Sequence, residues 1–474
     1  MVAVSVTIHK TDWLEGRRCP AKAWFGIHVG IAPPGPAIDF LVDQGREIAL
    51  KARELFPGAI FNARYQARPL SVTVDILERV ETGGWRVFEV RSSLASKPSS
   101  RRTGDARDLL GDLAFTVMVL RRAGLEIVGA SVLLLSPQYR YGDPVEKLFE
   151  IFDKTELVEE RVLEFEAQLP QLSETLLSAE PPAVALNANC RKCEYFATHC
   201  IGRGVAHSVL EIPHLRFKEM QILSEAGIVD FNAVPDDFPL IERQERAKYC
   251  VQTGNRYIGP HLKGKLESIQ WPCYYLDFES VMTALPLHPG HGCYRPILTQ
   301  FSVHRREGFD SPTTHAEYLA DAQRDCDREF AEALLAALGD TGSIFVYSVF
   351  EQDSIQALAA QFPDLAEALR NLVFRLVDLL PIIQKHVYDA AFRGRTTLKR
   401  VLPALVPDLS YKGLAIQDGG TAVALFARMA HGEISGDAMA QTRRDLLEYC
   451  AMDTMAMVRL HEALWSLCAE RITA

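Results

Sequence analysis

The sequence lacks the features that would place the protein in a membrane or give it a general affinity for nucleic acid. Its 474 residues contain no run of about 18 apolar residues, the length needed to cross a bilayer, so no membrane contact is expected. The first nine residues lack the basic flank and long apolar core of a signal peptide, which predicts a cytoplasmic location. The net charge is −10, so any contact with nucleic acid would depend on local basic patches.

The composition is that of a globular protein with more than one domain. Hydrophobic residues make up 48% of the chain, and the length is sufficient for two or three domains. In a cytoplasmic protein, the ten cysteines are expected to be reduced or committed to a metal or cluster.

An apolar stretch, 273–280, carries two acids, Asp277 and Glu279. In a strand, side chains at i and i+2 point to the same face, so the two carboxylates would lie side by side. Like charges repel, and ionising both away from water is costly. Mg²⁺ or Mn²⁺ would remove that cost, because both ions prefer carboxylate oxygens. The alternative is a strand end whose acids face solvent.

Two further segments supply residues of the same chemistry. Segment 441–469 has the apolar periodicity of a helix, in which Tyr449 and Asp453 share one face because they are four residues apart. We expect Asp453 to bind metal and Tyr449 to orient or deprotonate a water. Segment 344–353 is predicted to be a strand that leads into a helix, with Glu351 at the junction.

These three motifs, in this order, resemble those of the DnaQ-like (DEDD) 3′–5′ exonucleases of the RNase H-like superfamily. The resemblance covers roughly residues 270–474 and implies an α/β domain with a mixed sheet. It also implies two Mg²⁺ or Mn²⁺ ions and a water that Tyr449 orients for attack on a phosphodiester. The implied metal ligands are Asp277, Glu279, Glu351 and Asp453.

The middle motif departs from this family, which usually has Asp at the position of Glu351. Glutamate binds metal as well, but its side chain is one methylene longer. Asp353 and Asp378 are rival occupants of the middle position, and the sequence does not choose among the three.

Four cysteines have a one-plus-three layout. Cys190, Cys193 and Cys200 lie within eleven residues, and Cys19 would be the fourth ligand. The layout resembles that of the RecB-like nucleases with an iron–sulfur cluster, and four thiolates suit a [4Fe–4S] cluster. Structural Zn²⁺ is the alternative, because it also accepts four cysteines.

Between these cysteines, Asp75 and Glu89 on two predicted strands resemble the PD-(D/E)xK pattern of the same nucleases. In that pattern two acids bind metal and a lysine orients the water. Here Arg91 replaces the lysine, and its guanidinium is a poor base because it stays protonated. Asp75 and Glu89 would still hold one metal, but we expect a weakened site. The simplest alternative for Arg91 is a salt bridge to Glu89.

The resemblances predict an α/β protein with several domains. They are a RecB-like PD-(D/E)xK domain with the cysteine cluster at 1–204, a helical linker with a weak likeness to helix–hairpin–helix elements at 205–268, and a DnaQ-like domain at 269–474. This arrangement is similar to that of an uncharacterised bacterial family. The densest basic run is expected to meet a phosphate backbone, or else to be a solvated face. Its cations are Arg393, Arg395, Lys399 and Arg400.

The function predicted from these features is that of a metal-dependent nuclease, acting as a 3′–5′ exonuclease on DNA or RNA through the C-terminal site. The alternative is a catalytically inactive iron–sulfur scaffold that binds nucleic acid or a partner. The sequence points to no particular protein partner.

Overall fold

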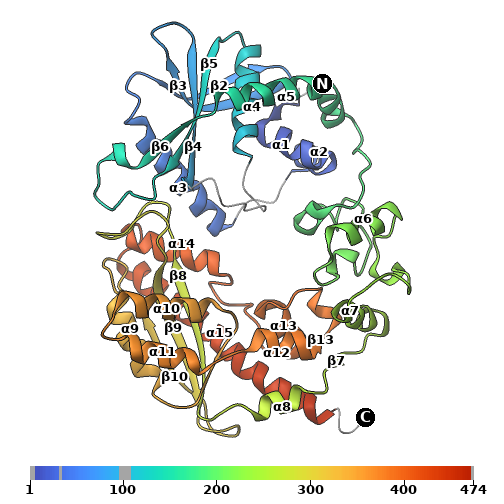
Figure 1. The fold of residues 1–474 in the computed structure, drawn as a ribbon, viewed down its shortest axis with the longest axis vertical. Helices are drawn as coiled ribbons and strands as arrows, with labels where there is room; N and C mark the ends of the chain where they lie inside the picture. Colours follow the sequence, from blue (N-terminus) through green and yellow to red (C-terminus); the bar gives the residue numbers. More distant parts are fainter. Residues whose placement is uncertain (1–5, 31–34, 96–107, 471–474) are drawn as a thin grey trace. The chain divides into compact units, whose positions relative to one another are not determined.

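The computed structural model describes residues 6–30, 35–95 and 108–470 (Figure 1). Residues 1–5, on which the expectation about a signal peptide partly depends, lie outside this range. The chain divides into two compact units, residues 1–204 with 283–295 and residues 205–282 with 296–474. Each unit combines helices with a mixed β-sheet, which confirms the α/β class.

None of the helices in the described ranges has the length and apolar character needed to span a bilayer.

The first unit is built on a six-stranded sheet in the order β1-β3-β4-β5-β6, with β2 also paired to β3. The pairs β1–β3 and β4–β5 are parallel and the others are antiparallel. Its main elements are β1 (Ile8–His9), α1 (Lys10–Arg18), α2 (Pro20–His28), α3 (Pro36–Arg53), β2 (Ile60–Ala67), β3 (Leu70–Arg79), β4 (Trp85–Leu94), α4 (Leu109–Arg122), β5 (Ile127–Leu135), β6 (Phe149–Asp153) and α5 (Thr155–Leu177).

Side-chain alternation gives this sheet two apolar faces. On β5, Val132 belongs to the cluster formed with α1, α4 and α5, whereas Leu133 belongs to the cluster formed with α3. Trp13 of α1 is fully buried, and its ring centroid lies 5.6 Å from that of Phe165 on α5. The sheet is therefore covered by helices on both faces, as expected when its strands are apolar on both sides.

The second unit contains a five-stranded sheet in the order β10-β9-β8-β11-β12. The pairs β10–β9 and β9–β8 are antiparallel, and β8–β11 and β11–β12 are parallel. Its main elements are α6 (Phe217–Glu225), α7 (Glu242–Thr253), β7 (Tyr257–Ile258), α8 (Leu262–Glu267), β8 (Cys273–Val281), β9 (Ile297–Arg306), β10 (Thr314–Leu319), α9 (Asp327–Leu338), β11 (Ser343–Val346), α10 (Phe350–Gln361), α11 (Ala366–Phe374), β12 (Leu376–Asp378), α12 (Leu379–His386), β13 (Val387–Tyr388), α13 (Leu398–Leu405), α14 (Gly419–Ala430) and α15 (Gly436–Glu470).

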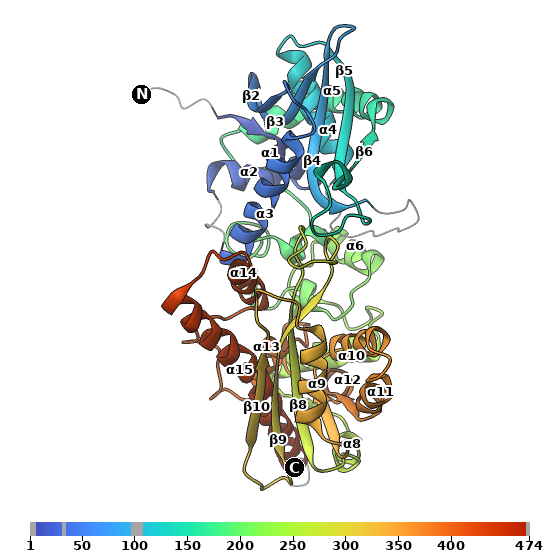
Figure 2. The same cartoon turned by 90° about the vertical axis from the view of Figure 1, so that its left-hand side faces the viewer.

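Strand β8 separates two environments. Leu276 and Phe278 pack into the apolar cluster with α9, α10 and α11, so the alternate residues Tyr275 and Asp277 point to the opposite face. Figure 2 shows α15 beside that opposite face of the strands. An acid on this face of β8 therefore lies opposite α15 and outside the main apolar cluster.

Hydrogen bonds fix the rotation of α15 about its own axis. Tyr275 Oη and His461 Nδ1 lie 2.8 Å apart, and both residues are buried. Two helical turns before His461 on α15, the Thr454 hydroxyl lies 2.7 Å from both Ser302 Oγ and His304 Nδ1. Because these contacts reach both β8 and β9, they determine which face of α15 meets the sheet.

The segment predicted as a linker, 205–268, packs within the second unit. Strand β7 pairs with β13 in a short antiparallel sheet, and Arg256 forms a 2.9 Å ion pair with Asp389. Helices α6 and α7 are joined by segment 226–241, which contains a short 3₁₀ helix, Phe231–Ala233.

Candidate metal centre

Three carboxylates from β8 and α15 converge in the second unit. One oxygen from each of Asp277, Glu279 and Asp453 lies within 4.8 Å of the other two. The two residues on β8 share a face because they are two apart in a strand, and Asp453 comes from the face of α15 that meets the sheet. Cys450, one turn earlier on α15, lies 3.7 Å from Asp277 Oδ2. Oxygens this close can bind one divalent cation.

Burial and mutual repulsion make these acids hard to ionise. Burial raises the pKa of Asp277 well above its usual value, and the charges of Asp453, Glu279 and Glu351 raise it further. Burial, followed by the charge of Asp453, raises the pKa of Glu279 to about 8. The pKa of Asp453 is also raised, again chiefly by burial. A divalent cation would relieve this repulsion, so the donor set fits Mg²⁺ or Mn²⁺.

Glu351 belongs to the same electrostatic cluster. It is buried in the first turn of α10, and burial raises its pKa to about 7. Its charge raises the pKa of both Asp277 and Glu279. The group of three mutually close carboxylates does not include Glu351, and its Oε2 accepts a 3.1 Å hydrogen bond from Ser348.

The two rivals for the middle position lie in different settings. Asp353 is exposed on α10. Asp378 caps α12, where its Oδ1 accepts a 2.8 Å hydrogen bond from the backbone N–H of Leu380. Because only Glu351 affects the titration of both acids on β8, it is the best of the three candidates for a fourth ligand.

Two tyrosines and a lysine border the acids. Tyr411 donates a 2.5 Å hydrogen bond to Asp453 Oδ1. Lys399 Nζ donates to Tyr449 Oη at 2.9 Å and to the carbonyl of Gln417 at 2.7 Å. It also lies 5.0 Å and 4.9 Å from the ring centroids of Tyr411 and Tyr449, within the range of cation–π attraction. Lys399 is therefore held between the two phenols.

The protonation state of Tyr449 follows from this setting. Burial raises its pKa above the usual value, and the charges of Asp453 and Glu279 raise it further. The phenol is neutral at physiological pH and can donate a proton in a hydrogen bond, so it is suited to orienting a water and not to deprotonating one. The positive charge of Lys399 lowers the pKa of Glu279, but burial raises that pKa by more.

Helix α14 begins beside the same residues. A Cβ atom at Gly419 would lie 3.8 Å from Glu279 Oε2 and 4.0 Å from Tyr449 Oη. The backbone at the start of α14 therefore forms part of the boundary of the centre.

The predicted basic run is divided among different roles. Lys399 lies at the acids, as described above. Arg393 Nη1 donates to Glu211 Oε1 at 2.8 Å and to the carbonyl of Ala206 at 2.9 Å, which ties its loop to the start of the second unit. Arg395 and Arg400 are exposed, and these two remain available for a polyanion.

The N-terminal acids lie in a contrasting environment. Glu89 is buried on β4, where Lys10 Nζ contacts its Oε1 at 2.5 Å and Arg91 Nη1 contacts its Oε2 at 3.1 Å. The Thr116 hydroxyl also donates to Glu89 Oε1 at 2.8 Å. Asp75 on β3 accepts a 2.9 Å hydrogen bond from the backbone N–H of Val90. The Arg91–Glu89 salt bridge considered from the sequence is thus present.

The two cations largely neutralise this pair. Burial alone would raise the pKa of Glu89, but the charges of Lys10 and Arg91 outweigh it and hold the pKa at about 2. Burial, followed by the charge of Glu89, raises the pKa of Asp75 to about 6. Arg91 also pairs with Asp112. This cluster carries its own counter-charges and fits a divalent cation less well than the C-terminal acids do.

The four predicted cluster cysteines line one small cavity in the first unit. Cys19 lies between α1 and α2, and the others come from the turns after α5; all four border the cavity. Burial raises the pKa of Cys190, and the other three thiols raise it further through their charges. Trp24, Phe25 and Tyr195 pack around them. Four thiols in an apolar setting fit both centres considered above, [4Fe–4S] and Zn²⁺. The cavity cysteines are Cys19, Cys190, Cys193 and Cys200.

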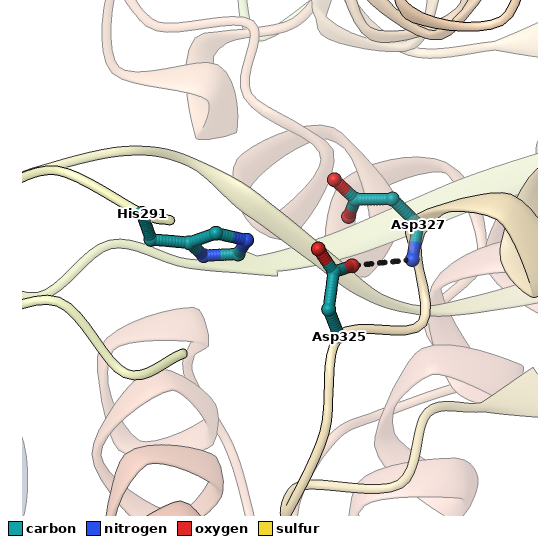
Figure 3. A group of neighbouring side chains, drawn as sticks. All are labelled: His291, Asp325 and Asp327. Atoms are coloured by element: carbon teal, nitrogen blue, oxygen red, sulfur yellow. Dashed lines mark hydrogen bonds between the residues drawn. The ribbon is translucent and has the colours of Figure 1, made fainter. Parts of the chain in front are cut away.

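A second pair of acids lies at the start of α9. The backbone N–H of Asp327 donates to Asp325 Oδ1 at 2.9 Å (Figure 3). Gln361 Nε2 donates to Asp327 Oδ2 at 3.1 Å. His291, also labelled in Figure 3, belongs to the segment 283–295 of the first unit. The hydrogen bonds of the two acids stabilise the turn into α9.

Comparison with known proteins gives little functional information. Residues 274–397 match a family described as "Domain of unknown function (DUF2779)", a span that contains Glu279 and Glu351 but ends before α15. No curated protein matches the chain. A solved structure titled "Crystal structure of SSO0001" aligns with a TM-score of 0.23 and 13% identity, covering 42% of this chain and 87% of that one. A likeness this low has no bearing on fold or function.

Proposed function

We propose that the second unit is a divalent-metal-dependent nuclease of the DnaQ-like type and that it removes nucleotides from the 3′ end of DNA or RNA. One observation carries the proposal. The oxygens of Asp277, Glu279 and Asp453 lie within 4.8 Å of one another, in a buried setting that disfavours their ionisation. Such a cluster costs stability unless it binds a cation, so its presence favours metal binding.

The protein groups have separable roles in this proposal. Asp277, Glu279 and Asp453 would hold the metal, with Glu351 as a further ligand. Two bound Mg²⁺ or Mn²⁺ ions would polarise the phosphoryl group and lower the pKa of a water. Tyr449, with its neutral phenol, orients the attacking water by a hydrogen bond.

Two neighbours position the reacting groups. The hydrogen bond from Tyr411 fixes one oxygen of Asp453. Lys399 donates to Tyr449 Oη, which fixes the position of the phenol beside the acids. The Lys399 ammonium also places positive charge where phosphoryl oxygens would collect negative charge.

The first unit has a different proposed role. We infer a RecB-like domain whose cysteines bind a [4Fe–4S] cluster, with Zn²⁺ as the alternative, and whose acidic site is inactive because Lys10 and Arg91 neutralise Glu89. The cysteine centre joins the Cys19 turn to a segment about 170 residues later in the chain. That cross-link favours a structural role for the centre.

A cleavage assay with labelled single strands tests the main proposal. Wild type should shorten DNA or RNA from the 3′ end in Mn²⁺, whereas Asp277→Asn and Asp453→Asn should not. Asp353→Asn is the matched control, because it removes an exposed carboxylate outside the cluster and should leave cleavage intact. Equal cleavage by wild type and both cluster variants would remove the proposal, and absence of metal-dependent cleavage in all of them would favour the inactive scaffold.

A further inference from the structure

A basic pocket lies in the second unit, apart from the carboxylates. Its lining comes from the segment before α6, helices α7 and α12, the β7–β13 pair and the loop that follows β13. Its volume is about 40 Å³, several times the roughly 10–15 Å³ that one water needs, so a group the size of a phosphate fits. The lining residues that matter for the argument are Arg243, Arg246, Tyr257 and Thr396.

The charge in this pocket is positive and not balanced within its lining. Arg246 is fixed in place, because it pairs with Glu242, donates to the carbonyl of Lys385 at 2.9 Å and lies 4.5 Å over the Tyr257 ring. Arg243 is exposed and, within the described ranges, has neither an ion-pair nor a hydrogen-bond partner. A guanidinium at a pocket mouth, backed by a second one, is suited to binding an oxyanion through paired N–H donors.

One wall of the pocket continues directly to the carboxylate centre. The Thr396 carbonyl accepts a 3.0 Å hydrogen bond from Tyr347 Oη, and Tyr347 follows β11, four residues before Glu351. The residue after Thr396 is the N-cap of α13, whose Lys399 contacts Tyr449. Exposed Arg395 lies on the same stretch. An anion in the pocket and a phosphodiester at the acids would thus contact one continuous segment of backbone.

We propose that this pocket binds a backbone phosphate of the substrate strand, upstream of the nucleotide that the carboxylates release. Arg243 is the principal contact and Arg246 supports it. This inference rests on the proposed nuclease function and specifies how the strand is held. The same phosphate chemistry could come from a free mononucleotide or inorganic phosphate, so the experiment separates these sources from the strand.

The test measures binding in the Asp277→Asn background, where cleavage does not obscure affinity. Fluorescence anisotropy compares a labelled dinucleotide with an oligomer of about 15 nucleotides, which can occupy an extended site. Arg243→Ala should weaken binding of the oligomer by about 5- to 10-fold and reduce its salt slope by about 0.7, the value for one phosphate of a single strand. The affinity for the dinucleotide should not change. Arg370→Ala on α11 is the matched control, because Arg370 is also an exposed arginine and lies outside the pocket lining.

Each outcome is informative. Arg243→Lys should retain most of the affinity, because it keeps the charge. Equal binding of the oligomer by Arg243→Ala and Arg370→Ala would overturn the inference. A second result would also overturn the inference. In it, inorganic phosphate or a mononucleotide raises the melting temperature of wild type and not of Arg243→Ala, while both proteins bind the oligomer with the same affinity. Weaker oligomer binding by Arg243→Ala, in a protein that never cleaves, would instead contradict only the proposed nuclease activity.

Discussion

Replacing Glu279 by Gln should stabilise the metal-free protein at neutral pH. Burial and the charge of Asp453 raise the pKa of Glu279 from 4.5 to about 8. Glutamine has a similar shape but never ionises, so the variant avoids the free-energy cost of protonating this side chain on folding or of burying its charge beside Asp277 and Asp453. The substitution also removes a proposed metal ligand, so the stabilisation by Mn²⁺ expected for wild type should be smaller or absent.

The magnitude and the sign follow from proton linkage. An unfolded glutamate loses its proton near pH 4.5, whereas folded Glu279 keeps it until about pH 8, so the folded state binds more protons between these values. Stability of the metal-free protein therefore falls as pH rises from about 4.5 to about 8. At about 1.4 kcal/mol per pKa unit, the full difference corresponds to at most about 5 kcal/mol. The variant should lack this part of the pH dependence.

Calorimetry of wild type and Glu279→Gln in EDTA, at pH values from about 5 to about 8.5, measures this effect. Because the chain has two units, its thermal unfolding can show more than one transition. The unfolding transition to compare is the one whose midpoint temperature rises when Mn²⁺ is added to wild type. Glu89→Gln is the matched control with the opposite expected sign. The pKa of Glu89 is held at about 2 by Lys10 and Arg91 against the effect of burial. Its replacement removes the ion-pair partner of Lys10 and one of the carboxylates paired with Arg91, so it destabilises the protein at neutral pH. A Glu279→Gln protein less stable than wild type at pH 8 without metal would refute the reasoning.

The remaining predictions concern activity and the cysteine centre. Asp277→Asn should reduce metal-dependent cleavage by more than about 10²-fold, as expected for loss of several kcal/mol of transition-state stabilisation, whereas Asp75→Asn should leave the rate unchanged; single-turnover assays compare the two. Tyr449→Phe should lower kcat by about 10²-fold with little change in KM, and Lys399→Met should lower kcat less, which steady-state kinetics can separate. Cys193→Ser should lower the iron or zinc content of anaerobically purified protein, measured by elemental analysis, without changing Mn²⁺ binding.

Parts of the centre were accessible from the sequence because they depend on local periodicity. Two-residue spacing in a strand placed Asp277 and Glu279 on one face, and four-residue spacing in a helix placed Tyr449 and Asp453 together. These rules hold within one element whatever the tertiary structure is. The structure then brings the two elements together.

The residues that the sequence did not reveal come from loops or from distant strands. Tyr411 lies in the irregular segment between α13 and α14, and no spacing rule connects it to Asp453. Lys10 reaches Glu89 because β1 pairs with β3 across about 60 residues of chain. Lys399 was expected to contact a phosphate backbone, and its contact with Tyr449 depends on how α13 packs. No local pattern encodes such contacts.

Long-range burial also decides to which unit a segment belongs. Segment 283–295 lies between two strands of the second unit in sequence, yet Ala284 and Cys293 are buried in an apolar cluster of the first unit. The segment predicted as a linker, 205–268, packs with the second unit. Both assignments depend on long-range burial, which composition alone does not specify.

A crystal of the protein grown with Mn²⁺ would test the central claim most directly, through an anomalous difference map at the manganese edge. We predict strong peaks beside the carboxylates of Asp277, Glu279 and Asp453, and none between Asp75 and Glu89. An empty C-terminal cluster, or manganese bound only at the N-terminal acids, would contradict this prediction.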